Sequence, residues 1–179
     1  MHFNEFGHVL SFDELWRATG LKKSQVQNWT NGRPFKIRGT IAHAAGKGSR
    51  NLYSIRDAYF LVFLQDLRGL DLAHSGLQRV IDHFDVVREE IARTGERDYF
   101  DPEYAWLAVN LTDRVSVIPL ETLSKPAEIR MGPSLELDDA RHRGARQFVV
   151  NIAKIRDEVD GRLEKLLKRK SNSRTSRSH

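Results

Sequence analysis

A chain of 179 residues is long enough for one hydrophobic core or for two small ones. It contains no cysteine, which excludes structural disulfides and thiolate metal sites, and no apolar run approaches the roughly 20 residues that a membrane-spanning helix needs. The formal net charge of +5 is unevenly placed, because nine Lys and Arg residues and no acidic residue lie between Glu14 and Asp57. This stretch predicts a surface that binds a polyanion, with a solvated polar face as the alternative.

The first predicted element is a short helix that begins at a capping box. Ser11 stands at the cap position and Glu14 follows three residues later, which is the spacing that satisfies backbone donors at a helix start. Phe12, Leu15 and Trp16 supply its apolar stripe. A Thr-Gly pair at 19–20 ends it, since glycine accepts the left-handed turn at little cost.

A second short helix is predicted over residues 23–31, and the pair forms a helix-turn-helix pattern. Val26 and Trp29 are spaced to face inward, and this spacing favours core packing of Trp29 over stacking on a base. The residues left outward or flanking are Lys23, Gln25, Gln27 and Asn28. Gln and Asn can bind an adenine edge in the major groove through two hydrogen bonds. Groove contact is therefore our interpretation, and plain polar surface is the alternative.

The next segment predicts a β-hairpin or wing with a basic tip at Gly46–Gly48. Lys47 and Arg50 would clamp the flanking DNA backbone or enter the minor groove, unless the hairpin is merely polar. Tyr53 has two candidate roles, because its ring can pack under the wing while its hydroxyl reaches a phosphate.

The rest of the chain predicts three longer helices and three strands. Ser54, with Asp57 three residues later, caps a strongly apolar helix that ends at Gly69, and another helix covers about 73–93. "YAWLAVNLTDRVSVIPL" indicates two strands around an Asn-Leu-Thr-Asp turn, and "GARQFVVNI" a third. Residues 124–143 are typical of a loop with one short helix. An amphipathic helix follows from Asn151.

These elements predict an α+β fold with three parts. Residues 1–95 form the DNA-binding domain, residues 96–167 an acidic α/β domain for dimerisation or partner binding, and residues 168–179 a disordered basic tail. The homodimer interface would be formed either by the helix that ends near Arg93 or by the terminal helix.

Residues 9–95 resemble the winged helix-turn-helix domain of the MerR family. The resemblance is carried by "SFDELWRATGLKKSQVQNW", by a wing that ends "RNLYS", and by "IRDAYFLVFLQDLRGLDLAHSGLQRVI". The chain departs from the family in the residues before Trp29 and in Arg50, which stands one position earlier than the usual wing arginine. The family's long dimerisation helix and effector domain are replaced by the acidic α/β segment, whose layout is similar to that of antitoxins with MerR-like domains.

The resemblance and the basic context together give the candidate DNA-binding residues. They are Lys22, Lys23, Ser24, Gln25, Gln27, Asn28, Arg33, Lys36, Arg38, Lys47, Arg50 and Tyr53. The histidines lack the spacing of a metal site, and no phosphate loop or nucleophile elbow occurs, so we expect no cofactor, no metal and no enzymatic activity.

The sequence therefore predicts a cytoplasmic, nucleoid-associated regulator that binds double-stranded DNA as a homodimer. Repression by occupying the site is at least as compatible with the chain as the promoter distortion that the resemblance implies. One alternative is an antitoxin-like autorepressor that binds a toxin through residues 96–167. A phage-type excisionase or architectural protein is a further alternative.

Overall fold

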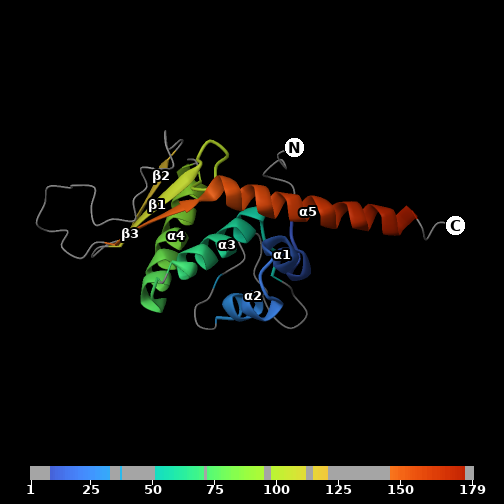
Figure 1. Cartoon of the computed structure of the whole chain (residues 1–179), viewed down its shortest axis with the longest axis horizontal. Coiled ribbons are helices and arrows are strands. Elements are labelled where there is room, and N and C mark those ends of the chain that lie inside the picture. Colours follow the sequence, from blue (N-terminus) through green and yellow to red (C-terminus); the bar gives the residue numbers. More distant parts are fainter. Residues whose placement is uncertain are drawn as a thin grey trace, which may run out of the picture. The chain divides into compact units, whose positions relative to one another are not determined.

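The computed structural model shows a mixed α+β chain, as the sequence predicts (Figure 1). The described residues are 9–32, 37, 51–70, 72–94, 98–111, 115–120 and 146–175. Within them the chain forms five helices and one three-stranded antiparallel sheet, and its last element is a helix. The described chain divides into two compact units, one made of 1–63 with 155–179 and the other of 64–154.

Helices α1 (Phe12–Thr19) and α2 (Lys23–Thr30) open the first unit and pack on each other. The predicted capping box is present: Glu14 N donates to Ser11 Oγ at 3.4 Å, and Ser11 N donates to a Glu14 carboxylate oxygen at 2.9 Å. Gly20 ends α1 in the left-handed conformation with φ of 69°. The chain therefore reverses at the one residue type that enters this region without a Cβ clash.

The C-terminal helix α5 (Ile152–Thr175) contacts that turn. Arg162 Nη1 donates to the carbonyl oxygen of Thr19 at 3.0 Å, while its Nη2 pairs with Glu158 at 2.9 Å. The first half of α3 (Ile55–Gly69) also contacts α5, because the Tyr59 hydroxyl donates to Asp160 at 2.7 Å. These contacts attach α5 to the two-helix pair (Figure 1).

A short β-bridge closes the first unit where the chain returns to α1. Leu10 and Tyr53 exchange backbone hydrogen bonds of 2.8 and 3.0 Å. Ser54 and Asp57 then form the predicted cap of α3, with Ser54 N donating to Asp57 Oδ2 at 2.7 Å. The bridge thus fixes residues 51–53 beside the N-terminal turn of α1.

The second unit contains α4 (His74–Thr94) and the sheet. The strands are β1 (Trp106–Leu111), β2 (Val115–Leu120) and β3 (Arg146–Asn151), in the order β2-β1-β3. The residues that alternate onto its core face are buried, and they are Leu107, Val109, Val117 and Val150. The three predicted strands are confirmed. Pro119 lies on the edge strand β2 opposite Leu107.

An aromatic cluster follows α4 within the second unit. Phe84 contacts Tyr99 edge-on with ring centroids 5.0 Å apart, and it lies 5.9 Å from Phe100. His83 Nε2 is 3.1 Å from the Tyr99 hydroxyl. Partial burial lowers the pKa of His83, because a charged imidazolium is poorly solvated there.

The C-terminal helix extends further than predicted. From Ile155 onward it belongs to the same compact unit as α1 and α2, where Arg162 contacts Thr19, 143 positions away; the predicted domain bounds stay a prediction. The helix continues to Thr175, through most of the residues predicted to form a disordered tail. Once a helix exists, each further residue adds a hydrogen bond at small cost, and Lys and Arg are good helix formers.

Some predicted features lie outside the described residues. They are the wing apart from Ile37 and 51–53, the turn at 112–114, the loop at 124–143 and the chain after 175. Within the described residues, no helix combines the length and apolar character needed to cross a membrane.

Two glycines near Arg162 provide a test of the α1–α5 contact. A Cβ on Gly20 would lie 2.8 Å from Arg162 Cζ, and φ is positive, whereas a Cβ on Gly161 meets nothing within 4 Å. We expect Gly20→Ala to destabilise the fold by at least about 1–2 kcal/mol, because the guanidinium must leave the Thr19 carbonyl as well. Gly161→Ala, the matched control, should stabilise it by about 0.5–1 kcal/mol. Urea unfolding measures both, and equal effects would contradict this account of the turn.

The lowered pKa of His83 predicts how stability depends on pH. The unfolded chain, with its ordinary imidazole pKa of 6.5, takes up the proton before the folded chain does. The contribution of neutral His83 is therefore complete above about pH 6.5 and is lost as the pH falls below it. We expect the fall in thermal midpoint between about pH 7.5 and 5.5 to be smaller in His83→Gln than in the parent. His74→Gln, exposed on the same helix, should keep the parent's fall. A parental fall in His83→Gln would refute the assignment.

Candidate nucleic-acid interface

Helix α2 buries one side and exposes the other. Val26 is fully buried and Trp29 is 2% exposed, so the predicted inward orientation is confirmed and Trp29 packs in the core. The side chains exposed on or beside the helix are Lys22, Lys23, Ser24, Gln27 and Asn28, while Gln25 is half-buried. The exposed face of α2 is therefore basic and amide-rich and contains no acid.

Hydrogen bonds on the buried side of α2 stabilise its last turn. Thr30 Oγ1 donates to the carbonyl oxygen of Val26 at 2.9 Å, and Ile37 N donates to that of Trp29 at 2.9 Å. These bonds satisfy carbonyls in the last turn of a short helix, which would otherwise fray. The exposed face is thus presented on a rigid support.

The start of α2 suits a negatively charged ligand. Its cap residue is Lys22, its first turn contains no acidic residue, and no side chain in the described part of the chain caps it. Backbone N–H groups and the positive end of the helix dipole lie here, beside the Lys22 and Lys23 side chains. This combination favours an anion such as a phosphate.

A second group of charges lies where α1 meets the start of α2. Trp16 is half-buried, with Arg17 Cζ 5.4 Å and Lys23 Nζ 5.6 Å from its ring centroid. Asp13 lies among them: it accepts from Trp16 Nε1 at 3.0 Å and pairs with Arg17 at 3.1 Å and Lys23 at 3.8 Å. The Trp16 hydrogen bond lowers the pKa of Asp13, and both bases add to this. Asp13 therefore stays ionised and neutralises part of the basic surface.

This group corrects the predicted apolar stripe of α1. Leu15 is buried, but Phe12 and Trp16 are only half-buried. Helical spacing places all three on one side, yet it does not show that Trp16 stacks under cations or that Phe12 borders an open pocket. Arg17 was not among the predicted site residues. Its position four residues after Asp13 was the available signal, since such pairs meet on one helix face.

Tyr53 is placed inside the first unit. It is 2% exposed, and its ring packs in the core. Burial raises its pKa, so the hydroxyl remains protonated. Of its two predicted roles, this placement favours ring packing.

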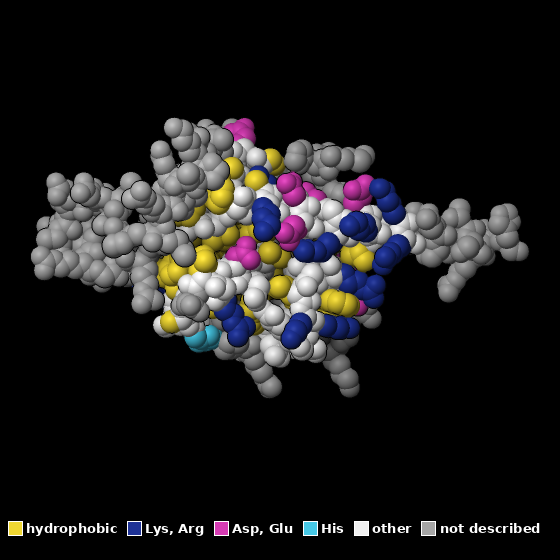
Figure 2. Space-filling view, viewed as in Figure 1, with side chains coloured by type: hydrophobic (Ala, Val, Ile, Leu, Met, Phe, Trp, Pro, Cys, Tyr) yellow, Lys and Arg dark blue, Asp and Glu magenta, His cyan; other side chains and the backbone are white. Residues whose placement is uncertain are grey.

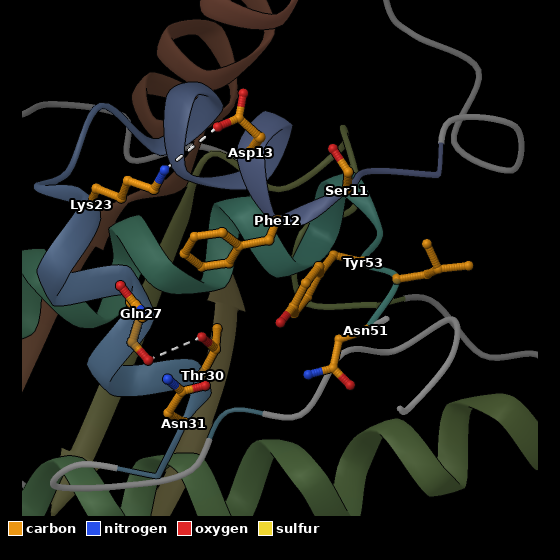
Figure 3. Close-up of a pocket in the computed structure, with 10 residues that line it drawn as sticks. Ser11, Phe12, Asp13, Lys23, Gln27, Thr30, Asn31, Asn51 and Tyr53 are labelled. Atoms are coloured by element: carbon orange, nitrogen blue, oxygen red, sulfur yellow. Dashed lines mark hydrogen bonds and ion pairs between the residues drawn. The ribbon is translucent and has the colours of Figure 1, made fainter. Parts of the chain in front are cut away.

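A pocket of about 510 Å³ lies between the start of α1, helix α2 and residues 51–53 (Figure 3). Phe12, Tyr53 and Leu52 supply apolar surface, and Gln27, Asn31 and Asn51 supply carboxamides. Lys23 and Asp13 also line it. The pocket shares Lys23 and Gln27 with the exposed face of α2.

Basic side chains also gather on the surface of the first unit. In Figure 2, Lys and Arg side chains gather over the part of the chain where Figure 1 places α1, α2 and α5, with fewer acidic side chains among them. The remaining predicted bases, Arg33, Lys36, Arg38, Lys47 and Arg50, lie outside the described residues, so their contacts stay predictions. Among the residues described, no three His, Asp or Glu side chains gather as a metal site would require.

No protein-family model matches the chain, and no curated protein sequence matches it significantly.

Proposed function

We propose that the protein is a sequence-specific regulator that binds double-stranded DNA as a homodimer, with α1 and α2 acting as a helix-turn-helix. The observation that carries the proposal is the acid-free exposed face of α2 above the buried side chains of Val26 and Trp29. A helix of eight residues is about 12 Å long, which matches the width of the major groove.

Two kinds of contact follow from that face. Gln27 and Asn28 carry amides that can donate to and accept from an adenine edge, which gives sequence preference. Lys22 and Lys23, with the start of α2 behind them, meet phosphates, which sets the register of the helix on the duplex. The Lys and Arg side chains that gather on the first unit in Figure 2 also favour the approach of a polyanion to this unit.

The dimer places two α2 helices in successive major grooves, about 34 Å apart along a near-palindromic site. The resemblance of residues 9–95 to MerR-family domains supports this arrangement and the wing. Occupation of a promoter is the simplest mode of action, because it requires no sensor domain. The site of action would be the nucleoid of the cytoplasm.

A second candidate adds a protein partner, as in an antitoxin, and one observation favours it. In the second unit Val86 is 64% and Ile118 47% exposed, which is high for large apolar side chains. Ile118 shares its sheet face with Ala108 and Val149. Mass spectrometry of the tagged protein from its native cell tests this, and Ile118→Lys should release a stoichiometric partner. Purification without any such partner would reject it.

The assignment of α2 as the reading helix predicts an effect of Gln27→Ala. The variant should relax base preference at one position of each half-site, because an amide pair to one base contributes about 1–3 kcal/mol of discrimination. Selection from a random duplex pool measures the profile. Gln78→Ala, on α4 of the second unit, is the control and should leave the profile unchanged. An unaltered profile for Gln27→Ala would remove α2 from the groove.

The contacts of Asp13 predict that Asp13→Asn binds DNA more tightly. The amide oxygen can still accept from Trp16, but Arg17 and Lys23 no longer face a neutralising charge. We expect an affinity about two- to fivefold higher at low salt, and a salt dependence steeper by up to about one counterion. Asp82→Asn, an exposed acid on α4, is the matched control. Fluorescence anisotropy at several salt concentrations measures the affinity and its salt dependence. Unchanged affinity would show that the cluster of Asp13, Arg17 and Lys23 does not face DNA.

A further inference from the structure

We infer that the pocket beside α2 binds the purine base of a free nucleoside, and that this ligand and DNA exclude each other. The pocket, of about 510 Å³, is within the range of small-molecule sites. Its lining comes entirely from the first unit, and its members converge from α1, α2 and residues 51–53 (Figure 3).

Hydrogen bonds within the chain hold the floor of the pocket. Thr30 is 6% exposed, and its hydroxyl bonds to the carbonyl oxygens of Val26 and Gln27 at 2.9 and 3.2 Å. Tyr53 is held by its backbone bridge to Leu10. A preformed floor lowers the ordering cost of binding.

The walls match a flat ring with a mixed polar edge. Phe12 is half-buried and offers an aromatic surface, on which any base can stack. Gln27, Asn31 and Asn51 each carry a carboxamide, which both donates and accepts. Adenine presents an acceptor and a donor side by side, which is the pattern that Asn and Gln bind with two hydrogen bonds. Three amides around one aromatic surface therefore favour a purine over an aliphatic ligand.

The rim favours an uncharged ligand. Among the described residues that line the pocket, Lys23 is the one base, and it lies 3.8 Å from the carboxylate of Asp13, which lines the pocket too. This pair carries no net charge, and its carboxylate would repel a phosphate. A free nucleoside has an exposed base and no charged phosphate. A base inside a duplex is paired, stacked and attached to phosphates, so it does not fit the pocket.

Mutual exclusion follows from shared residues and rests on the proposed function. Lys23 and Gln27 line the pocket and also belong to the exposed face of α2. A nucleoside that engages Gln27 removes it from the groove, and by linkage DNA must weaken the nucleoside to the same degree.

The test uses adenosine as the probe with the full chain and no DNA. Calorimetry should give a Kd below about 1 mM, and the side-chain amide signals of Asn31 and Asn51 should shift in NMR spectra. Asn31→Ala should weaken adenosine about five- to tenfold. Asn28→Ala is the matched control, because Asn28 is an exposed asparagine on α2, three residues before Asn31, and does not line the pocket, so adenosine affinity should be unchanged. Asn31 is exposed, and equal thermal midpoints will show that both variants fold.

The possible results of these experiments distinguish the purine site from the proposed DNA-binding function. No adenosine binding at millimolar concentration, equal binding in Asn31→Ala, or equal binding of uridine would overturn the purine site. Adenosine binding without any change in DNA affinity would overturn mutual exclusion. A chain that binds adenosine but no duplex would refute the proposed DNA function and leave the pocket standing.

Discussion

The bond between Arg162 and the carbonyl of Thr19 is the constraint on which the first unit depends. Thr19 ends α1, and Gly20 directs the chain toward α2 through a left-handed turn that brings the guanidinium close. A cation at the C-terminal end of a helix is favourable in itself, because it meets the negative end of the dipole. The turn between α1 and α2 is thus also stabilised from outside the pair, by a helix more than a hundred residues further along the chain.

Hydrogen bonds on the buried side of α2 also stabilise this arrangement. Thr30 is buried and its hydroxyl bonds to the carbonyl oxygens of Val26 and Gln27, so the face of α2 that bears the amides rests on polar contacts as well as on the side chains of Val26 and Trp29. Apolar burial alone tolerates small rotations of a helix, whereas hydrogen bonds have narrow geometric limits. A helix that must distinguish bases by the positions of amide groups benefits from this rigidity.

Local signals explain why much of the fold was predictable. The capping boxes at Ser11 and Ser54 act over three residues, and the alternation in the strands follows from the pleat, so both are visible in the sequence. The inward position of Trp29 followed from helical spacing in the same way.

Features built by distant residues were not predictable. The contact of Arg162 with Thr19 joins positions with no local relation, and the pocket exists only because the Leu10–Tyr53 bridge brings residues 51–53 beside α1. The contacts of Trp16 show the same limit, since hydropathy describes its apolar ring but not the cations beside it. The candidate site was thus half predictable: the face of α2 was, but Asp13, Arg17 and the pocket were not.

The position of Pro119 limits how copies of the chain can associate. It lies on β2, an outer strand of the described sheet, and it has no backbone N–H to offer to an incoming strand. A strand that added to β2 at this position would therefore lack one backbone hydrogen bond. Association of copies through the β2 edge would depend more on side-chain contacts, which substitutions can adjust without changing the backbone.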